Sequence, residues 1–110
     1  MSTRDSVLRL RDEAEAEVAT LERDLRELFE AARSANADDE HDPEGSTIAF
    51  ERAQLTSVLA AARRRVADLN DALHRLEAGT YGFCESCGAA IPAERLAARP
   101  SARTCIGCAS

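Results

Sequence analysis

The chain has 110 residues, enough for a single domain or for a small domain with an extension. Charged residues make up 31% of it and aromatic residues 4%, which argues against a large conventional core. The formal net charge of -6 disfavours a general affinity for DNA phosphates, and no apolar run approaches the roughly 20 residues of a membrane span.

One long helix is predicted from near Asp5 to about Asn36. Ser2 or Thr3 can cap its start, and Asp5 suits the first turn of a helix. No Gly or Pro interrupts the stretch, and apolar residues recur in it mostly in steps of three and four, a heptad seam that Arg11 interrupts. The members of this seam are Val7, Ala14, Val18, Leu21, Leu25, Leu28, Ala32 and Ala35.

Residues 37–47 are predicted to form an acidic loop, because Pro43 and Gly45 break a helical pattern. A second helix then runs to about Ala78, and Gly79 provides its C-terminal stop. Its seam again advances in steps of three and four residues, with Arg52 at the one polar position: Ile48, Leu55, Leu59, Ala62, Val66, Leu69, Leu73 and Leu76.

The two seams share a single antiparallel register. Two helices joined by a short loop fold back on each other, so paired positions should have numbers that sum to nearly a constant. The pairs do so: Leu28 with Leu55, Leu21 with Ala62, Val18 with Val66, Ala14 with Leu69, and Val7 with Leu76. We therefore expect an all-α fold, an antiparallel coiled-coil hairpin over residues 1–79, with a compact bundle or a dimeric four-helix bundle as alternatives.

All four cysteines of the chain lie in its last 27 residues, as Cys84-Glu-Ser-Cys87 and Cys105-Ile-Gly-Cys108. Two C-x-x-C pairs at this spacing predict a zinc site with four thiolate ligands, since each pair lets one tight turn present two sulfurs to the same ion. Four protein ligands leave no open position for water, so we expect one structural Zn²⁺ in a second module, residues 80–110.

A redox motif and a disulfide pair are the alternatives for these cysteines. A thioredoxin-like C-x-x-C needs a neighbouring βαβ pattern, and none surrounds these pairs. Disulfides belong to secreted chains, and the N-terminal residues form no apolar signal segment. We therefore expect reduced thiols and a cytoplasmic location.

The residues around the cysteines form a longer pattern over residues 79–108: Gly79-Thr80-Tyr81-Gly82-Phe83-Cys84-Glu85-Ser86-Cys87-Gly88, Ile91, Arg95-Leu96, Ala98-Arg99-Pro100 and Cys105-Ile106-Gly107-Cys108. This pattern resembles the DksA/TraR family of bacterial transcription factors, and the resemblance extends to the preceding hairpin. It implies a regulator of transcription initiation that binds RNA polymerase through its secondary channel rather than binding DNA. It implies no enzymatic activity, and we expect a monomer.

In such proteins the loop between the helices approaches the catalytic magnesium of the polymerase. The resemblance therefore marks Asp39, Glu40, Asp42 and Glu44 as polymerase-contacting tip residues, although Asp-x-x-Asp-x-Ala of active members is matched only at Asp42 in the frame counted from Cys84. Members that respond to the alarmone (p)ppGpp use basic residues near the zinc module. Arg99 is the candidate alarmone contact, while Asp68 and Ala109 stand where Lys is expected.

Two other functions compete with polymerase binding. One is a zinc-containing protein-interaction module without polymerase activity, which the inexact tip motif favours. The other is a DNA-binding zinc finger, which would need a basic recognition face. Residues 80–110 carry three Arg against two acidic residues, so that face is not evident.

Overall fold

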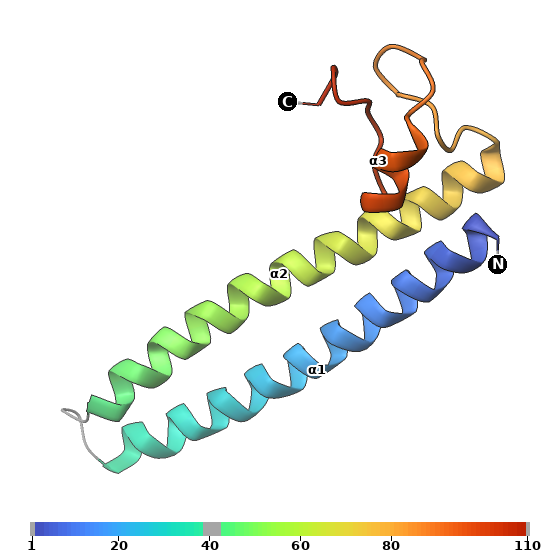
Figure 1. Cartoon of the computed structure of the whole chain (residues 1–110). Helices are drawn as coiled ribbons and strands as arrows, with labels where there is room; N and C mark the ends of the chain where they lie inside the picture. Colours follow the sequence, from blue (N-terminus) through green and yellow to red (C-terminus); the bar gives the residue numbers. More distant parts are fainter. Residues whose placement is uncertain (1, 39–42, 110) are drawn as a thin grey trace. The chain divides into compact units, whose positions relative to one another are not determined.

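The computed structural model describes residues 2–38 and 43–109, and the side chains of residues 2–34 and 47–109. It contains three helices, α1 (Thr3–Asp38), α2 (Pro43–Ala78) and α3 (Ala93–Ala98) (Figure 1). α1 and α2 form a helical hairpin, and the cysteine-bearing segment follows it. Within the described residues no β-strand forms, and Phe83 and Ala90 make one isolated antiparallel bridge. The predicted all-α class is confirmed.

The predicted start signal of the first helix, at Ser2, and the predicted stop signal of the second, at Gly79, are both confirmed. Ser2 Oγ accepts a hydrogen bond from the N–H of Asp5 at 3.1 Å, and the N–H of Ser2 donates to Asp5 Oδ2 at 3.4 Å, which is a capping box. At the end of α2, Gly79 has a φ of +77°. The N–H of Gly79 donates to Leu76 O at 3.4 Å and that of Thr80 to Arg75 O at 2.9 Å, the two bonds of a Schellman motif.

The predicted loop over residues 37–47 is too long. α1 continues to Asp38, and α2 already begins at Pro43. The physical reason is that the first N–H groups of a helix have no intrahelical acceptor, so a proline in the first turn loses nothing and its fixed φ suits the helix. Three of the predicted tip residues, Asp39, Glu40 and Asp42, lie outside the described residues.

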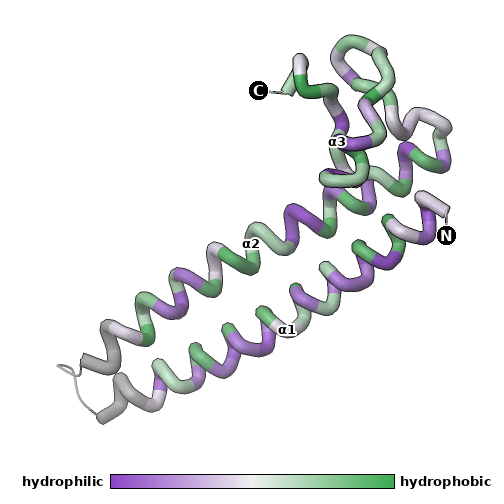
Figure 2. The backbone as a smooth tube through the Cα atoms, viewed as in Figure 1, coloured by the Kyte–Doolittle hydropathy of each residue, from purple (hydrophilic) through white to green (hydrophobic). Residues whose placement is uncertain are grey.

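The predicted seams are the buried faces of α1 and α2. Figure 2 shows apolar positions recurring along both helices between stretches of polar ones. Every seam residue whose side chain is described is buried or half-buried, and Val7 and Leu69 expose only 1% and 3% of their surface. The fully buried members are Val7, Ala14, Leu59, Ala62, Leu69 and Leu73.

The arginines that interrupt the seams have specific partners. Arg11 Nη1 donates to Asn70 Oδ1 across the two helices at 3.2 Å. The Arg52 guanidinium lies 5.2 Å from the centre of the Phe29 ring, a cation–π distance. Each arginine at a seam position therefore has a partner on the other helix.

The chain divides into two compact units. One contains residues 1–12 and 65–110, so it joins the start of α1, the end of α2, α3 and the cysteine segment. The other contains residues 13–64, where Arg63 Nη2 donates to Glu22 Oε2 at 3.0 Å. The boundary predicted between residues 79 and 80 coincides with the end of α2, and a separate domain over residues 80–110 stays a prediction.

A membrane-spanning segment would need a long apolar helix. No helix in the described ranges 2–38 and 43–109 has that combination of length and apolar character.

Candidate metal centre

The first cysteine pair lies in a tight backbone turn between residues 82 and 91. The N–H of Ile91 donates to Gly82 O at 2.7 Å, and the N–H of Cys84 donates to Ala89 O at 2.8 Å. The N–H of Gly88 donates to Cys84 O at 2.8 Å, and Gly88 has a φ of +77°. A left-handed residue is needed there to close the turn, which explains the glycine directly after Cys87.

The second pair forms a similar turn near the end of the described chain. The N–H groups of Cys108 and Ala109 both donate to Cys105 O, at 3.1 and 3.0 Å. Gly107 lies in this turn without a positive φ, so of the two cysteine turns only the first uses a left-handed glycine, Gly88.

The two turns bring the four sulfur atoms together. All four cysteines are free thiols, and their Sγ atoms lie within 4.8 Å of one another, close enough to hold one metal ion. Cys87 Sγ and Cys105 Sγ are 3.8 Å apart. A tetrahedron of zinc–sulfur bonds of about 2.3 Å places its sulfurs about 3.8 Å apart, so the cluster fits Zn²⁺ with shifts of no more than about 1 Å.

The electrostatics of the cluster also suit a cation. Hydrogen bonds from the backbone N–H groups of Cys105 and Cys87 lower the pKa of Cys84 to about 6. Hydrogen bonds with the thiols of Cys105, Cys84 and Cys87 raise the pKa of Cys108 to about 12. One sulfur therefore ionises easily while another resists ionising beside it. A divalent cation removes this conflict, because metal-bound thiols are deprotonated.

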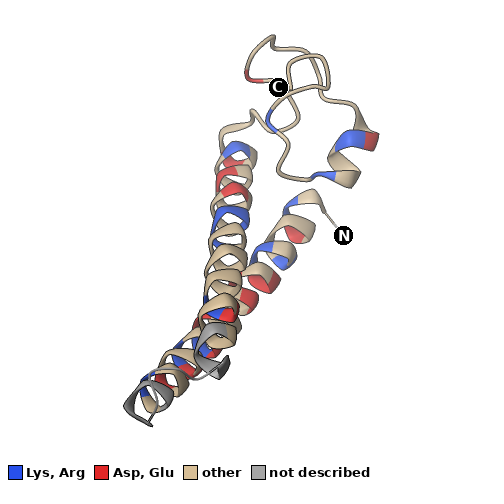
Figure 3. Cartoon of the chain, turned by 90° about the vertical axis from the view of Figure 1, so that its left-hand side faces the viewer, with Lys and Arg blue, Asp and Glu red and all other residues tan. Residues whose placement is uncertain are grey.

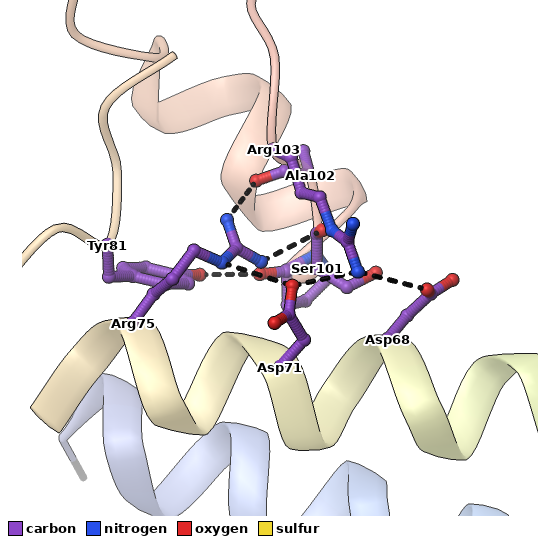
Figure 4. Close-up of polar contacts among 8 residues, drawn as sticks. Asp68, Asp71, Arg75, Tyr81, Ser101, Ala102 and Arg103 are labelled. Carbon is purple, nitrogen blue, oxygen red and sulfur yellow. Dashed lines mark hydrogen bonds and ion pairs between the residues drawn. The ribbon is translucent and has the colours of Figure 1, made fainter. Parts of the chain in front are cut away.

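Residues 100–104, which lead into Cys105, are held by side chains of α2, of the link after α2 and of α3. We name residues 100–104 the clasp segment. Tyr81 and Arg75 donate side-chain hydrogen bonds to its carbonyl oxygens, and Arg103 pairs with Asp71 at 2.8 Å (Figure 4). Arg95 donates a further side-chain hydrogen bond to Thr104 O. The residue pattern does not predict these contacts, since the acceptors are backbone atoms. The one available signal was the spacing of Asp71 and Arg75, four residues apart on a helix.

Arg99 is exposed at the rim of a polar hollow of about 400 Å³. The lining of this hollow includes Asp68 and Ala109, the two positions where the family resemblance expects Lys. Arg103, also in the lining, lies 3.7 Å from Asp68 and 2.8 Å from Asp71. Positions 68, 99 and 109, where the family resemblance expects basic alarmone contacts, thus lie around one hollow. One of these positions, Asp68, carries an acidic side chain instead. Glu44, the fourth predicted tip residue, lies in the first turn of α2, and its side chain is not described.

Residues 79–110 match the model of the prokaryotic dksA/traR C4-type zinc finger. The four clustered thiols agree with that description, so the chain has one structural zinc site. The match covers the segment that contains the cysteines, and both α1 and α2 lie outside it.

Two curated relatives extend the likeness beyond the cysteine segment. General stress protein 16O of Bacillus subtilis (strain 168) is 35% identical over 77 residues, which are 70% of this chain and 47% of that protein. RNA polymerase-binding transcription factor DksA of Escherichia coli (strain K12) is 41% identical over 46 residues, 42% of this chain and 30% of that protein. The matches span less than half the length of these relatives.

A solved structure covers nearly the whole chain. Transcription factor DksA2 from Pseudomonas aeruginosa superposes with a TM-score of 0.79 at 28% identity, over 96% of this chain and 75% of that one. The superposition therefore includes both the helical hairpin and the segment that follows it. The zinc-finger match, the curated relatives and this structural likeness all support membership of the DksA/TraR family.

Proposed function

We propose that the chain is a non-enzymatic transcription factor that binds RNA polymerase and modulates initiation. The observation that supports this most is the likeness to DksA2, a transcription factor, over 96% of the chain. A second relative is named for binding RNA polymerase. We place the protein in the cytoplasm, as a monomer, where that polymerase acts.

The helical hairpin is the part that we propose to enter the secondary channel of the polymerase. In residues 13–34 of α1, seven acidic side chains stand against three arginines, and all but one of the seven are exposed (Figure 3). Such a surface complements a positively lined channel, and complementary charge speeds and orients docking more than it adds affinity.

We propose a structural role for the zinc, with Cys84, Cys87, Cys105 and Cys108 as its ligands. When bound, the ion joins the two turns that the chain forms at residues 84–88 and 105–109. Four thiolates leave no coordination position for a substrate, so the site positions a surface and performs no chemistry.

DNA recognition by the zinc finger has less support. Residues 80–110 contain three arginines, and two of them are committed within the chain. Arg95 Nε donates to Thr104 O at 2.8 Å, and Arg103 pairs with Asp68 and Asp71. Arg99 alone does not form the basic face that phosphate binding requires.

The tip residues Asp39, Glu40, Asp42 and Glu44 are proposed to act on the polymerase rather than on folding. The change that tests this is the double substitution Asp39→Asn with Asp42→Asn, which keeps size and removes two charges. Thermal stability should stay within about 0.5 kcal/mol, as for ordinary surface changes. Polymerase should still be bound through the rest of the chain, while the effect on open-complex lifetime in a purified assay falls sharply.

A matched control removes two charges outside the tip and outside residues 13–34. Glu77 and Glu94 are both exposed, so Glu77→Gln with Glu94→Gln changes the net charge equally without touching either surface. This control should regulate like the parent. If the tip variant also regulates like the parent, the tip is only a solvated turn, and the alternative of an interaction module without polymerase activity gains support.

Arg99 is proposed as an alarmone contact of reduced strength, since Asp68 brings a negative charge to the same hollow. The open-complex assay, run with and without (p)ppGpp, tests this. A response that Arg99→Ala abolishes supports the contact, and a parent protein indifferent to (p)ppGpp contradicts it.

A further inference from the structure

The clasp segment, residues 100–104, has an unusual pattern of hydrogen bonds. Each of its five successive carbonyl oxygens accepts one bond. The donors are Tyr81 Oη to Pro100 at 2.8 Å, Arg75 Nη2 to Ser101 at 3.3 Å, Arg75 Nη1 to Ala102 at 3.2 Å, the N–H of Glu85 to Arg103 at 2.9 Å, and Arg95 Nε to Thr104 at 2.8 Å. The segment is thus fixed along its whole length, and Cys105 follows it directly.

Arg75 holds two parts of the chain at once. Its backbone carbonyl accepts the N–H groups of Thr80 at 2.9 Å and Tyr81 at 3.2 Å, which ends α2. Its guanidinium reaches from α2 to Ser101 and Ala102, as Figure 4 shows. A single residue therefore ties down the two stretches that lead to the cysteine pairs, the link before Cys84 and the segment before Cys105.

The surroundings of Arg75 favour a positioning role. Its side chain is only 14% exposed, and it lies 6.0 Å from the Tyr81 ring and 3.7 Å from Asp71 Oδ2. Burial raises the pKa of Tyr81, with the Arg75 charge opposing it, so the phenol stays a hydrogen-bond donor. Arg103 and its partner Asp71 are 42% and 40% exposed, so solvent screens that pair, and Arg75 is the stronger anchor.

We propose that Arg75 is a positioning residue of the zinc finger, which fixes the clasp segment before Cys105 and thereby couples zinc binding to the order of the last turns of α2. Zinc holds Cys105, and the clasp holds the five residues leading to it. Each constraint lowers the conformational entropy of this part of the chain, so less of that entropy is left for the other constraint to remove. By linkage, the factor by which the clasp tightens zinc binding equals the factor by which zinc tightens the clasp.

The first test measures zinc release from the full chain to a chromophoric chelator. Arg75→Gln removes the positive charge and the guanidinium that bonds two carbonyls. Groups that orient metal ligands contribute at least about tenfold to metal affinity, and this loss should appear as zinc release about tenfold faster. Arg65→Gln is the matched control, because Arg65 is an exposed arginine on the same helix and in the same unit. Its release rate should equal that of the parent.

A conservative variant separates charge from geometry. Arg75→Lys keeps the positive charge near Asp71 but lacks the planar fork that reaches two carbonyls, so it should recover only part of the retention. Tyr81→Phe removes only the bond to Pro100 O and should speed release by less than Arg75→Gln. If Arg75→Gln loses its helical circular dichroism signal, the rate of zinc release from the milder Tyr81→Phe variant tests the proposal instead.

The second test follows the coupling by hydrogen exchange. Removing zinc from the parent should increase deuterium uptake in residues 99–108 and also in the last turns of α2. In Arg75→Gln, zinc removal should no longer change uptake in α2, because the side chain that transmits it is gone. Equal zinc release from parent and Arg75→Gln, or an equal response of α2 to zinc in both, would overturn the proposal.

Discussion

Replacing Cys105 with Ser is expected to release the zinc and to unfold residues 80–110 while most of the helical signal remains. The reason is the small core of this segment: among its described residues only Cys84, Ile91 and Ala102 are buried. A module of about 30 residues with so little buried surface depends on its metal, and structural zinc contributes about 10–16 kcal/mol in comparable peptides. α1 and α2 contain 36 residues each, so they dominate the circular dichroism.

The measurement combines metal content with circular dichroism and hydrogen exchange on the purified chain. Ser86→Ala is the matched control, because Ser86 is exposed between two ligands and its side chain has no ligand role. This control should retain one zinc per chain. Stoichiometric zinc in the Cys105→Ser variant would show that the ion is held by other groups.

Leu69→Asp is expected to destabilise the hairpin by about 3–5 kcal/mol, because it places a charge without a partner at a buried position. Leu69 lies on α2 and is 3% exposed. The loss combines the missing apolar contacts with the desolvation of a carboxylate, whereas Leu69→Ala should cost about 2–4 kcal/mol through the cavity alone. Denaturant unfolding followed by circular dichroism measures both variants.

Ala67→Asp provides the control for the introduced charge. Ala67 is exposed on the same turn of α2, so its substitution should change the free energy of unfolding by no more than about 0.5 kcal/mol. Equal stability of the Leu69→Asp and Ala67→Asp variants would contradict the assignment of Leu69 to the core of the hairpin.

The seams and the metal cluster could be predicted because each depends on a repeating pattern. Val7 and Leu69 recur at coiled-coil spacing, and their burial needs no information beyond that spacing. Cys84 and Cys105 each begin a C-x-x-C pair, and two such pairs at this spacing are typical of a four-thiolate zinc site, so the cluster could be predicted without knowing how the intervening chain folds. Gly79 ended a helix as predicted, because only the left-handed region closes a Schellman motif there.

The remaining features depend on context that a residue pattern does not contain. Pro43 was assigned to a loop, although proline is equally suited to the first turn of a helix, and the structure uses it there. Phe83 is apolar and directly precedes a ligand cysteine, yet it is 53% exposed. The contacts of Arg75 were not predicted, because their acceptors are carbonyl oxygens of residues 101 and 102, and backbone atoms carry no sequence signature.

Binding to RNA polymerase is measured most directly by retaining purified bacterial core polymerase on the immobilised, zinc-loaded chain at physiological salt without DNA. We predict stoichiometric retention by the parent, and by the Asp39→Asn, Asp42→Asn double variant as well. Retention should weaken as salt rises, since complementary charge guides docking. Failure to retain polymerase, or retention only when DNA is present, would contradict the proposal that this chain acts by binding the enzyme itself.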